Sequence, residues 1–504
     1  MRFPALGVAA LLVLSGFGAP PARAQALEGK VTRITLDNGM RFLLVKRGVA
    51  PVFAANLRFK VGSADDPGGE TGLAHLFEHL AFKGTSTIGT RDAKQEAGIL
   101  DATDRAVMGL LAELDRGERA DATRLKGLRE ELASLQKKLQ EITVKDELSQ
   151  ILTGNGATGL NASTSSDLTS YVVALPSNRL ELWCALESAR LRDPVLREFY
   201  SERDVVMEER RMRIDNQPQG KLYEQLLLSA FQAHPYRSPT VGFPSDLDHL
   251  TRPAAMEFRR RHYLPNNAVG ALVGDIDPAA AERLLRRYFG GIPGGPVAAG
   301  PPTVEPAQTG ERRVTVEFDA EPQLMMAFHK DVWPSPDDPV FQVIDSLLTS
   351  GRTSRLFRRL VLETRVAADV YSLQAPGDRY ANVFLIGAVP RAPHAPAEVE
   401  AEILREVKRL ATEPIEEREL QKIRNQVEAS FLYPLRSNAG LASQISYYEI
   451  LTGDWNNLAA YKQALMATTP ARVQELARKT FVPSNLTVAV LSRPEGKGGD
   501  QGAP

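Results

Sequence analysis

Alternating apolar and polar residues predict strands near the start of the chain. The stretch "VTRITLDNGMRFLLVKR" contains two alternating segments joined by Asn38 and Gly39, a pair that favours a tight hairpin turn. The segment 52–63 is apolar enough for a buried strand, and 156–175 is rich in small residues before it alternates. Because helical periodicity follows these strands, the pattern predicts a mixed α+β unit.

A second copy of this unit is predicted in the later part of the chain. The blocks 260–274 and 478–492 each follow a helical stretch, share a turn and end in an apolar strand. A parallel doubly wound sheet is less favoured, because hairpins and clustered helices replace strict alternation of strand and helix. We therefore predict two homologous α/β-roll domains, each an antiparallel sheet with helices packed on one face. The matching residues are Tyr263 with Phe481, Pro265 with Pro483, and Asn267 with Asn485.

Composition along the chain predicts where these domains begin and end. A Pro- and Gly-rich stretch near the middle has the composition of an interdomain linker. The predicted segments are a signal peptide at 1–24, an N-terminal domain at 25–289, a linker at 290–311, a C-terminal domain at 312–492 and a tail at 493–504.

The region of about 101–148 has a different periodicity. Its apolar residues are spaced three and four apart with charged flanks, which is the heptad seam of a coiled coil. An inserted helical hairpin is the simplest interpretation, and its seam could be covered within the chain or by a partner. The seam residues are Leu125, Leu128, Leu132, Leu135, Leu139 and Ile142.

Charge and the N-terminal residues narrow the possible partners and location. The 504 residues carry a formal net charge of -1 without a basic face, so a nucleic-acid partner is not expected.

Residues 1–24 have a positive start, a short apolar run and a small-x-small cleavage site, which predicts a signal peptide cleaved after Ala24. No later segment is long and apolar enough to span a bilayer. Since Cys184 is the sole cysteine, no internal disulfide can form, and we predict a periplasmic protein.

The stretch "GLAHLFEHLAFKGT" contains the strongest candidate for chemistry. His75 and His79 are four residues apart and share one helical face, so both imidazoles can bind one ion. Glu78 lies near that face, where it can accept a proton without being a ligand; this is the inverted zinc-peptidase order. The alternative is an exposed helical face or a set of satisfied core groups. The chain has only seven histidines, and this spacing favours zinc.

A catalytic zinc needs a third protein ligand from elsewhere in the chain. The stretch "REFYSERDVVMEERRMRIDNQP" offers Glu202, Glu208 and Glu209. Glu202 and Glu209 are two helical turns apart and share a face, whereas Glu208 is rotated by about 100° from Glu209. Taken alone, these residues would be interpreted as a charged surface helix.

Three motifs, "GLAHLFEHLAFKGT", "GLNASTSSD" and "ERDVVMEERR", occur in this order and resemble the pitrilysin/insulinase family of zinc metallopeptidases, which includes the mitochondrial processing peptidases. The resemblance runs from about residue 28 to 490. It implies one zinc ion per chain held by His75, His79 and Glu209, with Glu78 as general base and Glu202 as a catalytic support. The region 101–148 accounts for the long spacing before the third ligand.

The resemblance also implies where a substrate would bind. Asn161 and Ala162 fall on the family's edge strand beside the metal, to which an extended peptide would add as a further strand. Active pairs in the family use an arginine and a tyrosine seven residues apart, and these positions hold Val361 and Ala368 here; Tyr371 is out of register. The chain therefore resembles the zinc-bearing subunit of a two-chain enzyme.

Together these observations predict a zinc-dependent endopeptidase acting on peptides or unstructured polypeptide segments. A second family chain would supply the arginine and tyrosine, although a homodimer remains open. Two other functions remain: a non-catalytic scaffold subunit, and a peptide-binding assembly factor suggested by the heptads.

Overall fold

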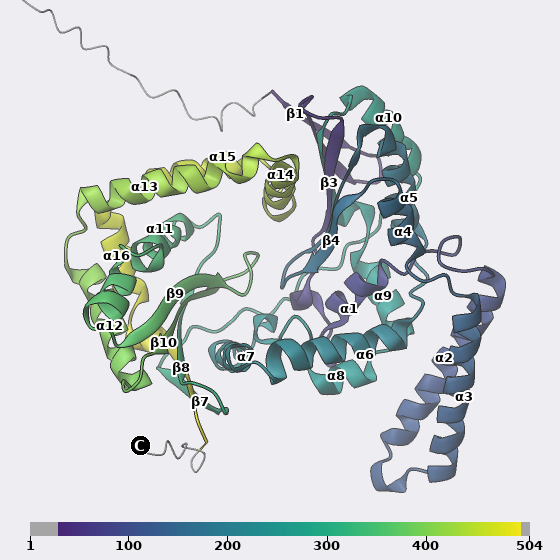
Figure 1. Ribbon diagram of the computed structural model, residues 1–504, viewed down its shortest axis with the longest axis horizontal. Coiled ribbons are helices and arrows are strands. Elements are labelled where there is room, and N and C mark those ends of the chain that lie inside the picture. The colour runs from purple at the N-terminus through teal and green to yellow at the C-terminus, as the bar shows by residue number, and fades with distance from the viewer. Residues whose placement is uncertain (1–28, 495–504) are drawn as a thin grey trace, which may run out of the picture.

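A computed structural model describes residues 29–494, which form two α+β halves side by side (Figure 1). The predicted signal peptide lies outside the described residues, so export stays a prediction. Among the described residues, none of the helices combines the length and apolar character that crossing a bilayer requires.

The first half is built on a six-stranded sheet of order β1-β2-β6-β3-β5-β4. The hairpin predicted at Asn38 and Gly39 joins β1 to β2, and Gly39 adopts a positive φ of 84°. All neighbouring strands are antiparallel except β2 and β6. The strands are β1 (Val31–Thr35), β2 (Arg41–Lys46), β3 (Val52–Phe59), β4 (Thr158–Thr164), β5 (Thr169–Pro176) and β6 (Ala268–Gly274).

The second half repeats this arrangement in a five-stranded sheet of order β7-β11-β8-β10-β9. Here too one pair, β7 and β11, is parallel and the others are antiparallel. The strands are β7 (Arg312–Glu317), β8 (Gln323–Lys330), β9 (Ala367–Ala375), β10 (Asn382–Pro390) and β11 (Leu486–Ser492).

Two asparagines show how closely the halves correspond. The Asn267 side-chain amide donates to the carbonyls of His262 and Lys60, at 2.8 and 3.2 Å. The Asn485 amide donates to the carbonyls of Thr480 and His329, both at 3.0 Å. In each half the asparagine therefore ties the end of a helix to the neighbouring strand.

Helices pack against one face of each sheet, as predicted. Their apolar sides form a large core with β2, β3, β5 and β6 in the first half and with β8, β10 and β11 in the second. In the first half these helices are α1 (Leu73–Leu80), α4 (Glu147–Gly154), α5 (Leu180–Arg192), α6 (Phe199–Arg210), α8 (Pro244–His249), α9 (Arg252–His262) and α10 (Pro278–Phe289). In the second they are α11 (Asp338–Thr349), α12 (Pro396–Thr412), α13 (Glu417–Leu432), α15 (Asn457–Met466) and α16 (Pro470–Thr480). Two further helices, α7 (Pro218–Ala230) of the first half and α14 (Asn438–Thr452) of the second, pack elsewhere.

The opposite face of each sheet is covered by a helix from the other half, a feature the sequence did not predict. Helix α14 packs on β3 and β6, and α7 packs on β7, β8 and β11 (Figure 1). The reason lies in the strands: Leu43 and Val45 point away from the first core, and they are buried against Leu441 and Ile445 of α14. Sheets that are apolar on both faces need a second layer.

Polar contacts also join the halves near the end of β4. The Asp167 carboxylate accepts hydrogen bonds from the Tyr236 hydroxyl at 2.7 Å and from the backbone N–H of Asp378 at 2.6 Å. The Arg379 guanidinium contacts both oxygens of Asp65 at 3.0 Å. The chain between β6 and β7 is attached as well, because the Glu305 carboxylate accepts the backbone N–H groups of residues 232–234, just after α7.

A helical hairpin occupies much of the region predicted to be an insertion. It consists of α2 (Ala93–Leu114) and α3 (Ala122–Ile142), which pack against each other and project from the first half (Figure 1). Helix α2 begins before residue 101 because the Asp92 carboxylate caps it, accepting the backbone N–H of Gln95. Leu128, Leu132, Leu135, Leu139 and Ile142 of the heptad seam pack on α2, so the chain itself covers part of the seam.

Candidate metal centre

Helix α1 carries the H-x-x-E-H motif, and the Gly-rich segment before it sets its position. Gly72 adopts a positive φ of 89°, and a Cβ there would lie 2.6 Å from the carbonyl oxygen of Val241. The half-buried Asp66 carboxylate accepts the backbone N–H groups of Gly72 and Ala74, both at 2.8 Å, at the start of the helix. The tight turn and this cap fix the direction in which α1 leaves the loop.

His75, His79 and Glu209 converge, as the sequence predicts for metal ligands. The Nε2 atom of His75 lies 3.6 Å from Oε1 of Glu209, and Nε2 of His79 lies 3.5 Å from Oε2. One ligand atom from each residue lies within 4.8 Å of the others. Two ligands of a tetrahedral zinc stand about 3.4 Å apart, given bond lengths of about 2.1 Å. The spacing and the nitrogen and carboxylate donors therefore fit zinc.

Glu202 lies on the same side of α6 as Glu209 and contacts the other nitrogen of His79. Its Oε2 is 3.4 Å from Nδ1 of His79, and its Oε1 is 2.6 Å from Nζ of Lys83. Arg213, in the π-helical turn after α6, reaches Oε1 of Glu209 at 2.7 Å. Glu208, in contrast, is 57% exposed and pairs with a neighbouring arginine. The helical spacing thus correctly separated Glu209 from Glu208.

Glu78 is the glutamate of the motif, and a residue at the end of a β-strand orients it. The Thr164 hydroxyl at the end of β4 donates to Oε2 of Glu78 at 2.7 Å. Burial raises the pKa of Glu78, although this hydrogen bond opposes the effect of burial. Glu78 therefore combines the properties of a proton acceptor: a fixed orientation and a basicity above that of an exposed glutamate.

The two histidines experience different electrostatic environments. Burial lowers the pKa of His75 to about 4, so its imidazole is neutral at pH 7. For His79, burial also lowers the pKa, but hydrogen bonds to Glu202 and Glu209 outweigh it and raise the pKa to about 9. The hydrogen bond to His79 in turn lowers the pKa of Glu209. The two carboxylates thus favour positive charge at this position.

Sequence reasoning did not identify Lys83, Arg213 or Thr164. Lys83 belongs to the same motif, four residues after His79, but α1 ends at Leu80, so helical spacing alone does not place it beside Glu202. Thr164 contacts Glu78 across 86 positions of the chain, and only the fold brings them together.

Asn161 and Ala162 lie on β4, which is the outermost strand of the first sheet. They pair with Val172 and Tyr171 of β5, which leaves the other side of β4 as an edge. Helix α1 contacts this strand, so the edge runs toward Glu78. The structure therefore places both residues on an edge strand beside the motif, and their role in binding stays a prediction.

Val361 and Ala368 occupy different environments in the second half. Val361 lies in the π-helical segment Phe357–Glu363 and packs against the core, whereas Ala368 is exposed on β9. None of the described contacts of Tyr371 is with a residue of the metal centre. Its hydroxyl accepts a hydrogen bond from the side-chain amide of Gln219 in α7 at 3.0 Å.

Two models of one peptidase family match this chain. The model described as insulinase (peptidase family M16) covers 41–107, and the model described as peptidase M16 inactive domain covers 249–427. The chain belongs to the insulinase family. The first model contains the H-x-x-E-H motif and ends inside α2, and whether the rest of the hairpin is an insertion stays a prediction.

Individual relatives match over nearly the whole chain. The zinc protease PqqE of Helicobacter pylori is 26% identical over 96% of this chain and 98% of its own length. A probable mitochondrial-processing peptidase subunit beta of Arabidopsis thaliana is 20% identical over 92% of this chain and 79% of its length. The crystal structure of a protease from Helicobacter pylori is 25% identical and matches with a TM-score of 0.76, covering 92% of this chain and 99% of that one. The family models and the names of these relatives support a peptidase family.

Proposed function

We infer that this chain is a zinc-dependent endopeptidase that hydrolyses peptides or unstructured polypeptide segments, and that a partner chain completes its substrate site. The convergence of His75, His79 and Glu209 beside an oriented Glu78 is the observation that carries this inference. The absence of the family's arginine and tyrosine at Val361 and Ala368 supports the need for a partner.

His75, His79 and Glu209 would hold the zinc, and bound zinc supplies a Lewis acid that polarises the scissile carbonyl. Glu202 is a positioning residue: its carboxylate faces Nδ1 of His79 and so keeps Nε2 free to act as a ligand. Lys83 compensates the charge of Glu202.

Glu78 accepts a proton from the attacking water and returns it to the amine that leaves when the peptide C–N bond breaks. The Thr164 hydroxyl orients Glu78 by hydrogen bonding to Oε2, so the other oxygen can face the water. An extended peptide would pair with the edge of β4 through its main chain, near Asn161 and Ala162.

Zinc binding and partner dependence test this function directly. Peptidase activity on an unstructured polypeptide is measured with and without chelator, on the chain alone and with family chains that carry the arginine and tyrosine. We expect one zinc per chain, loss of activity on chelation, recovery with added zinc, and a higher rate with the correct partner. Full activity of the chain alone would exclude the partner requirement.

A matched pair of variants tests the ligand set. Glu209→Ala should lose bound zinc and activity, whereas Glu208→Ala should retain both, because Glu208 faces solvent on the same helix. Equal zinc content in the two variants would contradict the assignment of Glu209.

The orientation of Glu78 gives a separate prediction. Thr164→Val removes a hydrogen bond to a carboxylate, so kcat should fall about tenfold, equivalent to ~1.4 kcal/mol, with unchanged zinc content. Thr164→Ser keeps the hydroxyl and should retain most of the rate. Steady-state kinetics of both variants check this, and equal losses would show that the hydroxyl has no such role.

The alternative is a non-catalytic scaffold or peptide-binding assembly subunit. Val361 and Ala368 favour it, since they lack the groups that hold substrate in active pairs of the family. Zinc binding without hydrolysis by the chain, alone and with every candidate partner, would support this alternative.

A further inference from the structure

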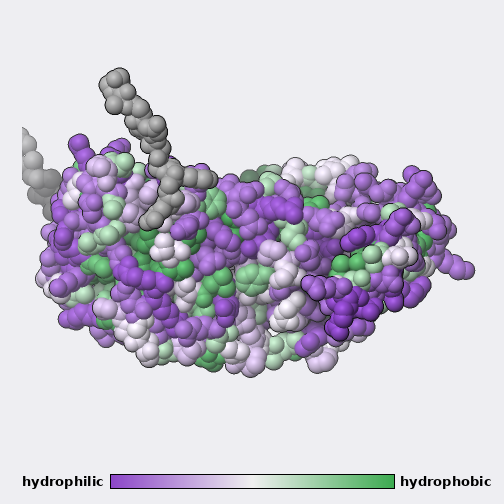
Figure 2. Space-filling view, turned by 90° about the horizontal axis from the view of Figure 1, so that it is seen from below, coloured by the Kyte–Doolittle hydropathy of each residue, from purple (hydrophilic) through white to green (hydrophobic). Residues whose placement is uncertain are grey.

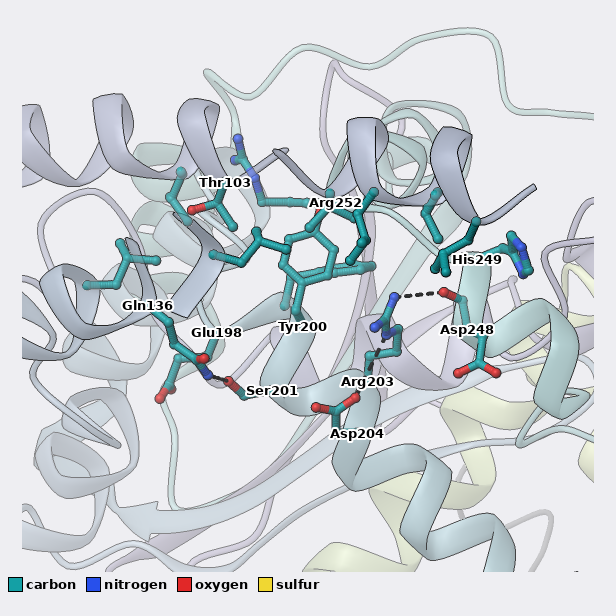
Figure 3. Close-up of a pocket in the computed structure, with 18 of the residues that line it drawn as sticks. Thr103, Gln136, Glu198, Tyr200, Ser201, Arg203, Asp204, Asp248, His249 and Arg252 are labelled. Carbon is teal, nitrogen blue, oxygen red and sulfur yellow. Dashed lines mark hydrogen bonds and ion pairs between the residues drawn. The ribbon is translucent and has the colours of Figure 1, made fainter. Parts of the chain in front are cut away.

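A groove of about 640 Å³ separates the helical hairpin from α6 and from the segment joining α8 to α9 (Figure 3). It lies away from the metal centre, because Tyr200, Arg203 and Asp204 of α6, which line it, are on a different side of the helix from Glu202 and Glu209. Apolar side chains form a continuous part of its wall along α2, and polar and charged side chains form the rest. The apolar residues that the inference uses are Leu100, Val107, Leu111 and Leu114 of α2, Leu132 of α3 and Phe199 of α6.

The hairpin groove, defined by these residues, is long and open at one end. From Leu100 to Leu114 it follows α2 for about 21 Å, at 1.5 Å per residue. Leu100 is buried at one end, while Leu114 is 42% exposed at the other. A groove of this length, lined along one side by a helix, suits a helical segment of about four turns better than a compact small molecule.

Hydrogen bonds close the groove near its Leu100 end, where they join the hairpin to the body of the first half. The Tyr200 hydroxyl of α6 donates to Asp104 of α2 at 3.0 Å, and Gln136 of α3 donates to the Ser201 hydroxyl at 3.3 Å. Arg252 donates to the same Asp104 carboxylate at 2.6 Å. Because these contacts connect the hairpin to the body, the groove is formed before anything binds.

Carboxylates outnumber cationic side chains at the rim of the groove. Arg252 is paired with Asp104, and Arg203 donates to the backbone carbonyl of Asp248, so both cationic side chains already have partners. The Asp204 carboxylate is 79% exposed and reaches Arg203 only at 4.0 Å. Asp248 also lines the groove, as does Asp115, which pairs with His249 at 3.5 Å. An apolar occupant with lysine or arginine beside it would complement this rim.

The surface around the hairpin is mainly polar, which favours a local binding site over a broad apolar interface. In the view from below, the end of the molecule that carries the hairpin is mainly hydrophilic, with small hydrophobic areas between (Figure 2).

We propose that the hairpin groove binds an amphipathic helical segment of another polypeptide, with bulky apolar side chains on one face and basic residues flanking them. This interaction is independent of zinc and of hydrolysis.

Binding of a labelled peptide tests the proposal. The probe is a helical peptide of about five turns built from leucine and lysine, and its fluorescence anisotropy is measured with the full chain carrying Glu78→Gln, so that it is not cut. Matched peptides replace lysine by glutamate or leucine by serine. We expect the leucine–lysine peptide to bind and both matched peptides to bind at least tenfold more weakly.

Variants locate the site. Leu111→Asp places a carboxylate in the wall and should weaken binding at least tenfold, whereas Met108→Asp, at a 48% exposed position of α2 outside the lining, should leave it unchanged. Asp204→Lys should weaken binding and reduce its dependence on salt. Circular dichroism checks folding of each variant, and hydrogen exchange on the Glu78→Gln chain should show protection by the peptide on α2 and the start of α6. Absence of binding, equal binding of the glutamate peptide, equal losses at Leu111 and Met108, or protection elsewhere would overturn the proposal.

Discussion

Replacing Glu78 by glutamine is expected to lower kcat about 10²- to 10⁴-fold while zinc content stays at one ion per chain. Glutamine has the same shape, and its side-chain oxygen can still accept the Thr164 hydroxyl, but it cannot take a proton from water. Metal analysis and steady-state kinetics with the partner present measure the two quantities separately.

A matched glutamate controls for nonspecific effects. Glu70, in the loop before α1, has no described contact with His75, His79 or Glu209, so Glu70→Gln should leave both zinc content and kcat within about twofold of the parent. If Glu78→Gln keeps the parental rate, Glu78 is not the general base. If it loses zinc as well, Glu78 supports the metal centre rather than the proton transfer.

The parts of the site that the sequence predicted are those set by local geometry. Helical spacing alone puts His75 and His79 one turn apart, and puts Glu202 and Glu209 on one side of α6. The Asn38-Gly39 turn and the shared Asn267 and Asn485 turns are also local, since each depends on a few consecutive residues.

Periodicity and turn motifs do not predict which distant segments of the chain contact each other. The burial of Leu43 and Val45 shows that β2 is apolar on both faces, but the sequence does not say that α14 covers one of them. The parallel pairing of β2 with β6 likewise depends on a strand more than 200 positions away. Thr164 reaches Glu78 for the same reason, through the order of strands in the sheet.

Arg197 provides the largest predicted effect on stability, because it joins the metal-bearing part of the first half to the hairpin. It is 1% exposed, and its guanidinium contacts both oxygens of Glu96 in α2, at 2.8 and 3.0 Å. It also donates to the carbonyls of Lys83, Thr85 and Ile88, in the loop after α1. This one side chain therefore holds together the end of α1, the start of α2 and the segment leading into α6.

Arg197→Met should lower the free energy of unfolding by about 3–5 kcal/mol, because it leaves the buried Glu96 carboxylate without its cation. Denaturant unfolding measures this, and Arg192→Met, at an exposed position five residues earlier, should change stability by less than about 0.5 kcal/mol. The double variant Arg197→Met, Glu96→Leu should recover part of the loss, since it removes the stranded charge as well. Equal stability of the single and double variants would show that the carbonyls of the 83–88 loop, rather than the ion pair, account for the role of Arg197.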